Sequence, residues 1–350
     1  MNSTDILGIR LYNQLLAENR LKEPEEVVSY MGAMQSQASE MAKWGIGNRL
    51  EDASHQRVTE ALDAGRIIRT HILRPTWHFV SAEDIHWMIP LSTSRLKPVF
   101  LSYAKMIGID EASMPRRSVQ VINTLEKQGH LTKQEIDEQL KNEGIEIDER
   151  ELSIILSQAE IEGIVCNGVA KGIKHTYALL EERVPKTRSF DKEEALATLA
   201  YKFFSSHGPA TLQDFIWWSG LLITEARSAL EMVKEQFVSE TLNGREFWMK
   251  NDIRIPEKGK DSALLLPPFD EFVVSYKDRS ELIEDEHYGK VMTKNGLFSP
   301  TVMLNGRIIG SWKKVTKKKM PEVEISFFKK TSQKTERLVQ AAIQEYLRFL

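Results

Sequence analysis

The sequence predicts an α+β fold of three tandem winged helix-turn-helix modules followed by a β-rich C-terminal part. Two observations predict it. A run of three helices and a β-hairpin occurs twice in the middle of the chain, and strand-like alternation with an Asn-Gly turn dominates after Lys260. The chain has 350 residues, more than one hydrophobic core usually spans. We place the parts at 1–110, 111–188, 189–258 and 259–350.

The first module is the loosest match to the pattern. Apolar residues at helical spacing predict helices within 23–34, 36–50 and 54–65, the last of them closed by Gly65. Residues 66–80 then alternate like two paired strands about Arg74-Pro75. A linker to the next module is expected near 107–117.

The second and third modules repeat one another. In the second, helices are predicted at 118–128, 131–144 and 148–163, with a hairpin at 164–180; Thr132 and Glu135 form a capping-box pattern. In the third, helices are predicted at 192–207, 208–220 and 224–237 before a hairpin turning at Asn243-Gly244. Thr211 and Asp214 stand where Thr132 and Glu135 stand in the second module.

The C-terminal part is predicted to be mostly strands. Segments 263–276, 297–315 and 322–330 alternate or run apolar, with a turn at Asn305-Gly306. An amphipathic helix over 333–350 closes the chain.

Composition excludes several classes of protein. A single cysteine, Cys166, cannot form an internal disulfide, a thiolate zinc cage or an iron–sulfur cluster. The N-terminus does not resemble a signal peptide, and no apolar run approaches the ~20 residues of a membrane helix. We therefore expect a cytoplasmic protein without a membrane partner.

Charge is distributed unevenly. The whole chain has a net charge of −3, but residues 301–350 contain 11 Lys+Arg and 4 Asp+Glu, a balance of +7 that leaves −10 elsewhere. This asymmetry indicates a polyanion-facing end, and a solvated lysine-rich surface is the alternative.

The sequence carries none of the familiar motifs for nucleotide hydrolysis, dinucleotide binding, zinc proteolysis or serine hydrolysis. The eight histidines lack metal-ligand spacing, so we expect neither a metal nor another cofactor. His71 and His78 lie in one strand-like segment, where odd spacing puts them on opposite faces.

The third helices of the second and third modules are acidic or mixed, which suits major-groove reading poorly. Phosphate contacts are better expected from lysines of the wing and of the C-terminal hairpin. These candidates are Lys171, Lys174, Arg307, Lys313, Lys314 and Lys317, with Lys318 and Lys319 beside them. Modules that are scaffolds or bind protein remain an alternative.

Gln35 and Gln37 flank Ser36 between two predicted helices. If Ser36 lies near a helix N-terminus, Gln35 in the approach and Gln37 in the first turn can face one point. Two amides at one point could bind and orient a water molecule. An idle surface pair is the alternative, because glutamine is common there.

At these residues the sequence resembles the AlkZ-like DNA glycosylases, winged-helix proteins of the HTH_42 group, over nearly its whole length. The resemblance rests on MQSQ at 34–37, RPTWHFV at 74–80, HGPATLQDFIWWSGL at 207–221, LLPPFDEFVVSYKDRS at 265–280 and SPTVMLNGRIIGSW at 299–312. It implies three tandem winged-helix modules that form a concave surface for double-stranded DNA.

The resemblance also implies a chemistry. In the family a Gln-x-Gln motif carries catalysis, and Gln35 and Gln37 match it, although Ser36 stands where members often have an apolar residue. Trp77 and His78 match a family stretch and are expected near the substrate. The implied activity is a monofunctional glycosylase for N7- or N3-alkylated purines in DNA repair, acting as a monomer, with interstrand crosslinks left open. A non-enzymatic winged-helix transcription regulator is the alternative.

Overall fold

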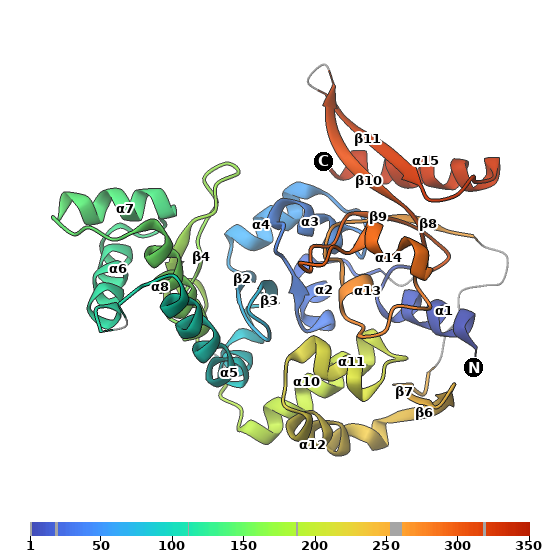
Figure 1. Ribbon diagram of the computed structural model, residues 1–350, viewed down its shortest axis with the longest axis horizontal. Helices are drawn as coiled ribbons and strands as arrows, with labels where there is room; N and C mark the ends of the chain where they lie inside the picture. The colour runs from blue at the N-terminus through green and yellow to red at the C-terminus, as the bar shows by residue number, and fades with distance from the viewer. Residues whose placement is uncertain (1, 18–19, 111, 187, 253–260, 318–319) are drawn as a thin grey trace. The chain divides into compact units, whose positions relative to one another are not determined.

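The computed structural model of the protein describes residues 2–350 apart from 18–19, 111, 187, 253–260 and 318–319 (Figure 1). It is a mixed helix-and-sheet structure in which the hairpins and the large sheet are antiparallel. The chain divides into two compact units. The first, which we call the glutamine-motif unit, consists of Met1–Val58 and Leu196–Leu350; the second, the central unit, is Thr59–Ala195.

The N-terminal part of the glutamine-motif unit contains helices and one short strand. They are α1 (Ser3–Asn13), α2 (Pro24–Met31), β1 (Met34–Gln35), α3 (Ser39–Gly47) and the start of α4 (His55–Asp63). Asn2 caps α1 in a capping box with Asp5. Pro24 begins α2, at a position where the backbone N–H that proline lacks would have no partner within the helix. Gly32 ends α2 with φ +79°, which a side chain would strain.

The same unit continues after residue 195 with three helices and a hairpin. These elements are α10 (Lys192–His207), α11 (Leu212–Ser219), α12 (Ile223–Val233), β6 (Phe237–Leu242) and β7 (Arg245–Lys250), with a short 3₁₀ turn at Lys234–Gln236. Thr211 and Asp214 form the predicted capping box. Asn243 and Gly244, with φ of 51° and 74°, make the predicted hairpin turn.

A four-stranded sheet completes the unit. Its strands β8 (Ala263–Leu266), β9 (Thr301–Leu304), β10 (Arg307–Lys317) and β11 (Met320–Phe327) lie in the order β11-β10-β9-β8. The final helix α15 (Gln333–Phe349) packs along β8 and β11. Tyr346 of α15 packs against Trp44 of α3 and Trp312 of β10, with ring centroids 5.3 and 4.8 Å apart, respectively.

One predicted strand is wrong in this region. The extended segment expected over 263–276 ends at Leu266, and the chain then forms α13 (Glu271–Val274). The physical reason is local: the Asp270 side chain accepts a hydrogen bond from the Phe272 N–H at 2.9 Å and so caps a helical turn. Helix α14 (Asp285–Val291) follows.

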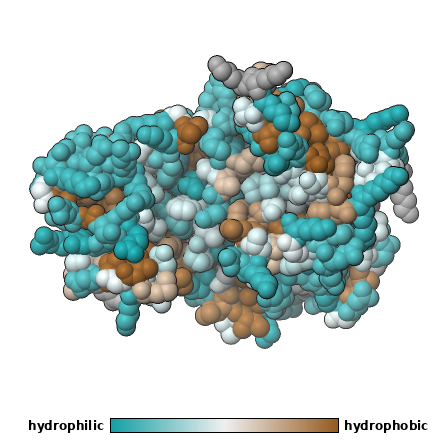
Figure 2. All heavy atoms as spheres, turned by 45° about the horizontal axis from the view of Figure 1, so that its top comes forward, coloured by the Kyte–Doolittle hydropathy of each residue, from teal (hydrophilic) through white to brown (hydrophobic). Residues whose placement is uncertain are grey.

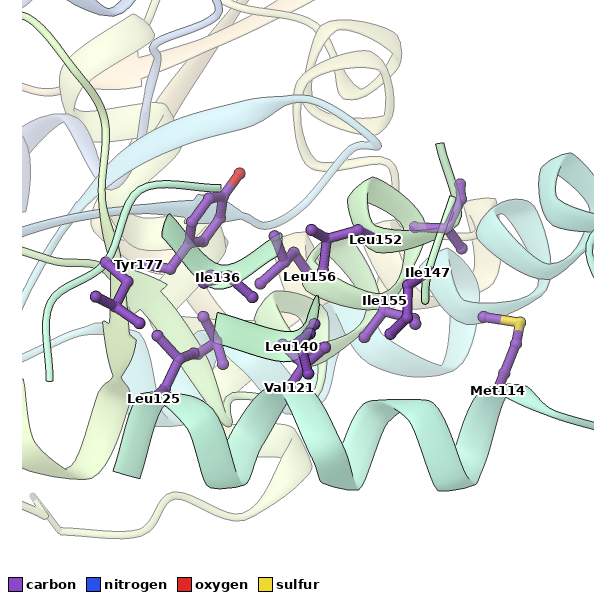
Figure 3. Packing of buried hydrophobic residues seen from close by; sticks show 14 of the residues in the cluster. Met114, Val121, Leu125, Ile136, Leu140, Ile147, Leu152, Ile155, Leu156 and Tyr177 are labelled. Atoms are coloured by element: carbon purple, nitrogen blue, oxygen red, sulfur yellow. The ribbon is translucent and has the colours of Figure 1, made fainter. Parts of the chain in front are cut away.

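The central unit holds two hairpins and a group of helices. Its elements are β2 (Ile67–His71), β3 (Trp77–Ser81), α5 (Ile85–Met106), α6 (Met114–Gln128), α7 (Lys133–Asn142), α8 (Glu149–Ile161), β4 (Val165–Asn167), β5 (Tyr177–Leu179) and α9 (Leu180–Arg183). Helices α6, α7 and α8 share a core in which Val121, Leu125 and Ile136 are fully buried (Figure 3). The 22-residue helix α5 is an element that the sequence pattern did not reveal.

Local signals in the central unit are confirmed. The capping box of Thr132 and Glu135 is formed from both sides, at 2.7 and 3.2 Å. Asp148 caps α8, and Gly129, Gly144 and Gly163 all have positive φ just after helix ends. The order helix, helix, helix, hairpin is thus present at 114–179 and again at 192–250. The assignment as three winged-helix modules, and its boundaries, stay predictions.

The surface drawn in Figure 2 is largely hydrophilic, and its hydrophobic side chains form separate patches. Among the residues that the structure describes, no helix has the length and apolar character needed to cross a membrane.

Candidate active site

The Gln35–Gln37 segment lies between α2 and α3 in the glutamine-motif unit. Gln35 ends the short strand β1 and is buried, with 8% of its surface exposed, whereas Gln37 is exposed. Gln37 was predicted in the first helical turn, and this is wrong. Helix α3 begins only at Ser39, because Ala38 has a non-helical backbone with ψ 76°. Gln35 therefore ends a strand, and Gln37 lies in the bend that precedes α3.

A buried carboxylate holds this segment from behind. The Oε1 atom of Glu271 accepts the backbone N–H of Gln35 at 2.6 Å, across 236 positions of sequence. Its Oε2 atom accepts from the Trp218 indole N–H at 3.1 Å and from the Ser275 hydroxyl at 2.5 Å. Glu271 is 1% exposed, so three donors replace water around this carboxylate.

His207 lies next to the same carboxylate. Its Nε2 is 3.8 Å from Glu271 Oε2, and its ring stacks on Phe203 at 4.9 Å and leans toward Trp218 at 5.4 Å. Complete burial lowers the pKa of His207, and the neighbouring Glu271 only partly opposes this shift. We therefore treat His207 as neutral near pH 7.

The segment 207–209 is fixed by residues from α1 and by a buried tyrosine. Arg10 Nε donates to the Pro209 carbonyl at 2.9 Å, and Asn13 Nδ2 donates to the Gly208 carbonyl at 2.8 Å. The Tyr276 hydroxyl donates to the His207 carbonyl at 2.8 Å, and burial raises the pKa of Tyr276 to about 12. Three of the motifs that carry the family resemblance, at 34–37, 207–221 and 265–280, thus meet in one buried network.

Trp77 and His78 lie in β3 of the central unit. The strand register pairs Trp77 with His71 and His78 with Thr70, so His71 and His78 face opposite sides of the hairpin, as predicted. The Trp77 indole N–H donates to Glu160 Oε2 at 3.2 Å, and His71 contacts the same oxygen. His78 is fully buried, and its Nδ1 lies 2.9 Å from the Thr76 carbonyl. The proximity of Trp77 and His78 to substrate stays a prediction.

The predicted phosphate contacts divide into paired and unpaired cations. Lys171 bridges both oxygens of Glu135, at 2.7 and 2.8 Å, and this contact lowers the pKa of Glu135 to about 2. On the β10–β11 hairpin, Lys313 pairs with Glu324 at 2.9 Å, and Lys317 with Glu322 and Glu324 at 3.3 and 3.2 Å. Much of the charge on that face of the hairpin is therefore balanced.

Three other candidates are exposed and have no ion pair among the described residues. They are Lys174, Arg307 and Lys314. Lys314 sits opposite Val323 and therefore on the other face of the hairpin from Lys313, which sits opposite Glu324. Lys318 and Lys319 lie outside the described residues. These roles in DNA contact stay predictions.

One group of described side chains has the composition of a metal site. Atoms of Glu284, Glu286 and His287 lie within 4.8 Å of one another. The ammonium of Lys329 already contacts both carboxylates, at 3.1 Å for Glu286, and both are largely exposed. Since a lysine neutralises this group, we assign it no metal.

Sequence reasoning missed Glu271, Trp218, Ser275 and His207. A usable signal was present: the acidic pair Asp270-Glu271 interrupts the otherwise apolar run from Ala263 to Val274. Carboxylates are seldom buried unless they are paired or hydrogen-bonded, so an acidic pair in such a run indicates buried partners elsewhere in the chain.

Comparison with known proteins places this geometry in context. The sequence matches the family described as DNA glycosylase AlkZ-like over residues 28–349. The interstrand DNA cross-link repair glycosylase of Streptomyces sahachiroi is 22% identical over 329 residues, which cover 88% of this chain and 86% of that protein. The solved structure of the Streptomyces sahachiroi DNA glycosylase AlkZ matches with a TM-score of 0.80 at 20% identity, over 100% of this chain and 96% of that one. At this identity the structural likeness shows a shared fold.

Proposed function

This chain belongs to the AlkZ-like DNA glycosylase family, and we propose that it is itself a monofunctional DNA glycosylase for purines alkylated at N7 or N3. The observation that supports the proposal best is the position of the Gln-Ser-Gln segment. Its first glutamine is held through the backbone by Glu271, in a network built from three of the segments that carry the family resemblance.

The chemistry suits two neutral amides. Alkylation at N7 or N3 gives the purine a positive charge, so the base leaves as a neutral molecule without protonation. A water molecule then forms a bond to C1′ as the N-glycosidic bond breaks, and it releases a proton to solvent. Gln35 ends β1 and Gln37 follows two residues later in the bend before α3, and we infer that the two amides hold this water together. Their carbonyls accept from the water and orient it, which contributes by positioning.

Selectivity follows from the same residues. An amide is too weak a base to activate water strongly and cannot protonate a departing base. Unmodified purines should therefore remain attached. Interstrand crosslinks that join two purines through alkylated nitrogens present the same leaving group, and the name of the Streptomyces relative points to such substrates. We include them in the proposed substrate class.

We assign DNA binding to the helical modules and hairpins. Residues 114–179 and 192–250 have the helix and hairpin order of winged-helix modules, and we propose a third such module in the N-terminal 110 residues. Lys174, Arg307 and Lys314 would contact phosphates, because they are exposed cations without an ion pair in the described part of the chain. Phosphate contacts carry no base information, which suits an enzyme that must inspect any sequence.

Release of free 7-methylguanine from methylated duplex DNA tests the proposal. Wild type should release the base and leave an intact strand with an abasic site. Gln35→Ala and Gln37→Ala should each slow release by about 100-fold or more. Gln134→Ala is the matched control, because Gln134 is an exposed glutamine whose side chain bonds only its helix neighbour Glu138 at 2.9 Å. Equal rates for wild type and Gln37→Ala would exclude the catalytic role.

The same preparation distinguishes the regulator alternative. A glycosylase should bind unmodified duplexes of different sequence almost alike. A regulator should select one duplex sequence over random DNA by roughly 4 kcal/mol or more. Sequence selection together with no base release would favour the regulator.

A further inference from the structure

Glu271 is a buried acidic residue whose carboxylate accepts a hydrogen bond from the backbone of the proposed catalytic motif. The contact is short, 2.6 Å between the Gln35 nitrogen and Oε1, as expected for a charged acceptor. The other oxygen, Oε2, is occupied by Trp218 and Ser275. Oε1 thus holds the motif, and Oε2 contacts Trp218 and Ser275.

The donors around Glu271 match an ionised carboxylate. An ionised carboxylate only accepts, and a backbone N–H, an indole N–H and a hydroxyl all donate to it here. The buried guanidinium of Arg49 pairs with the neighbouring Asp270, at 2.9 Å through both terminal nitrogens. The Glu271 carboxylate stands one hydrogen bond behind the motif.

We propose that Glu271 is a positioning residue for the glycosylase reaction. It anchors the Gln35 peptide, so that the two amides present a water molecule at one place, and it supplies the negative charge that neutral glutamines lack. This inference rests on the proposed function. Departure of the base leaves a positively charged, oxocarbenium-like sugar, and a buried carboxylate near the motif favours that charge more than it favours the neutral ground-state sugar.

The packing makes the anchor rigid. Trp218 is fully buried, and a side chain on Gly32, three residues before Gln35, would meet its ring at 3.3 Å. The indole thus packs under the turn that leads into β1 while its N–H holds Glu271. Displacing the Glu271 carboxylate would therefore release the Gln35 peptide without opening the surrounding aromatic core.

The test compares Glu271→Gln with Glu231→Gln. Glutamine has the same shape as glutamate but no charge, and its terminal NH₂ group is a donor that cannot accept a hydrogen bond from Gln35 or Trp218. Glu231→Gln makes the same substitution at an exposed acid that pairs with Lys234 and does not contact the motif. The assays are the single-turnover rate of 7-methylguanine release at saturating enzyme, the Kd for duplex DNA, and the thermal unfolding midpoint.

For Glu271→Gln we expect a rate loss of about 10- to 100-fold, with a Kd within about twofold of wild type. Glu231→Gln should stay within about twofold of the wild-type rate. Two outcomes would overturn the inference: a Glu271→Gln rate equal to wild type, or an equal rate loss in both variants. Should Glu271→Gln fail to fold, Glu271→Asp replaces it, because the shorter side chain keeps the charge but withdraws it from the Gln35 peptide.

A second readout does not depend on activity. In ¹⁵N-glutamine-labelled wild type, the Gln35 amide proton should resonate at unusually low field and exchange slowly, as a short bond to a buried carboxylate requires. An ordinary, rapidly exchanging amide would overturn the anchor even if every variant failed to fold. If wild type releases no base while this amide behaves as expected, the proposed function fails and the anchor geometry stands.

Discussion

Arg49 and Asp270 form a bidentate ion pair in the core of the glutamine-motif unit, with both nitrogen–oxygen distances at 2.9 Å and neither side chain exposed. Arg49 also donates to the Gly45 carbonyl at 2.7 Å and to Gln14 at 3.1 Å. The pair ties the end of α3 to the residue that precedes Glu271. The position of the proposed anchor therefore depends on a buried charge pair one residue away.

Removing one partner of this pair should be strongly destabilising. In Asp270→Asn, the Arg49 guanidinium would remain buried without a countercharge, and we expect a loss of about 3–5 kcal/mol in unfolding free energy. Denaturant titration followed by tryptophan fluorescence measures it. The control is Glu231→Gln, which breaks the exposed pair with Lys234 and should cost less than about 1 kcal/mol. A loss in Asp270→Asn no larger than the control would contradict the prediction.

The hairpin lysines should contribute unequally to DNA binding. Lys314→Ala should weaken binding to all duplexes and reduce the salt dependence by about one unit of slope. Lys313→Ala should do less, because Glu324 already neutralises Lys313. Conversely, Glu324→Gln frees Lys313 and partly frees Lys317, so it should tighten binding and steepen the slope. Binding of the three variants to duplex DNA, measured at several salt concentrations, tests this prediction. If the salt dependence of binding is unchanged in all three, this hairpin lies outside the DNA interface.

Gly47 should not tolerate a side chain. A Cβ there would lie 2.7 and 2.9 Å from ring atoms of Phe349 and 2.9 Å from the Trp44 ring. We expect Gly47→Ala to cost about 1–3 kcal/mol, because α15 must shift away from α3. Gly289→Ala in α14 is the matched control: no atom lies within 4 Å, so it should be neutral or stabilise by up to about 1 kcal/mol. Thermal unfolding of the two variants gives the comparison, and similar midpoints would argue against close packing of α15.

His175 should make the central unit less stable in mild acid. Burial, with smaller contributions from Arg69 and His71, lowers the pKa of His175 to about 3, and its Nε2 has no hydrogen-bond partner among the described residues. The unfolded chain binds this proton near pH 6.5 and the folded chain does not. Stability is therefore full above about pH 6.5 and falls as the pH drops from there toward 3.

His175→Phe removes this titration and keeps an aromatic ring beside Tyr177, 4.6 Å away in the native protein. Relative to wild type, the variant should gain up to about 2 kcal/mol between pH 7.5 and pH 5.0. Cys166, which is buried in β4 of the same unit, reports unfolding through its reaction with a thiol reagent in denaturant. An identical difference between the two proteins at both pH values would refute the assignment.

Much of the secondary structure could be predicted because its signals are local. The capping boxes at Thr132 and Thr211 close over three residues, and the turns at Asn243-Gly244 and Asn305-Gly306 need only positive φ at neighbouring positions. The strand expected over 263–276 was wrong because the local signal for it, an apolar run, was ambiguous. An apolar run alone does not distinguish a strand from a buried turn, and the Asp270 cap made the difference.

The sequence by itself determined the capping boxes at Thr132 and Thr211, the Asn-Gly hairpin turns and the repeated order of helices and hairpin, since each element depends on residues a few positions apart. Only the tertiary structure decided which groups surround the glutamine motif. Glu271 meets Gln35 across 236 positions, and Glu324 reaches Lys313 only once β10 and β11 pair in register. Burial and charge pairing are properties of neighbours in space, and those neighbours exist only after the chain has folded.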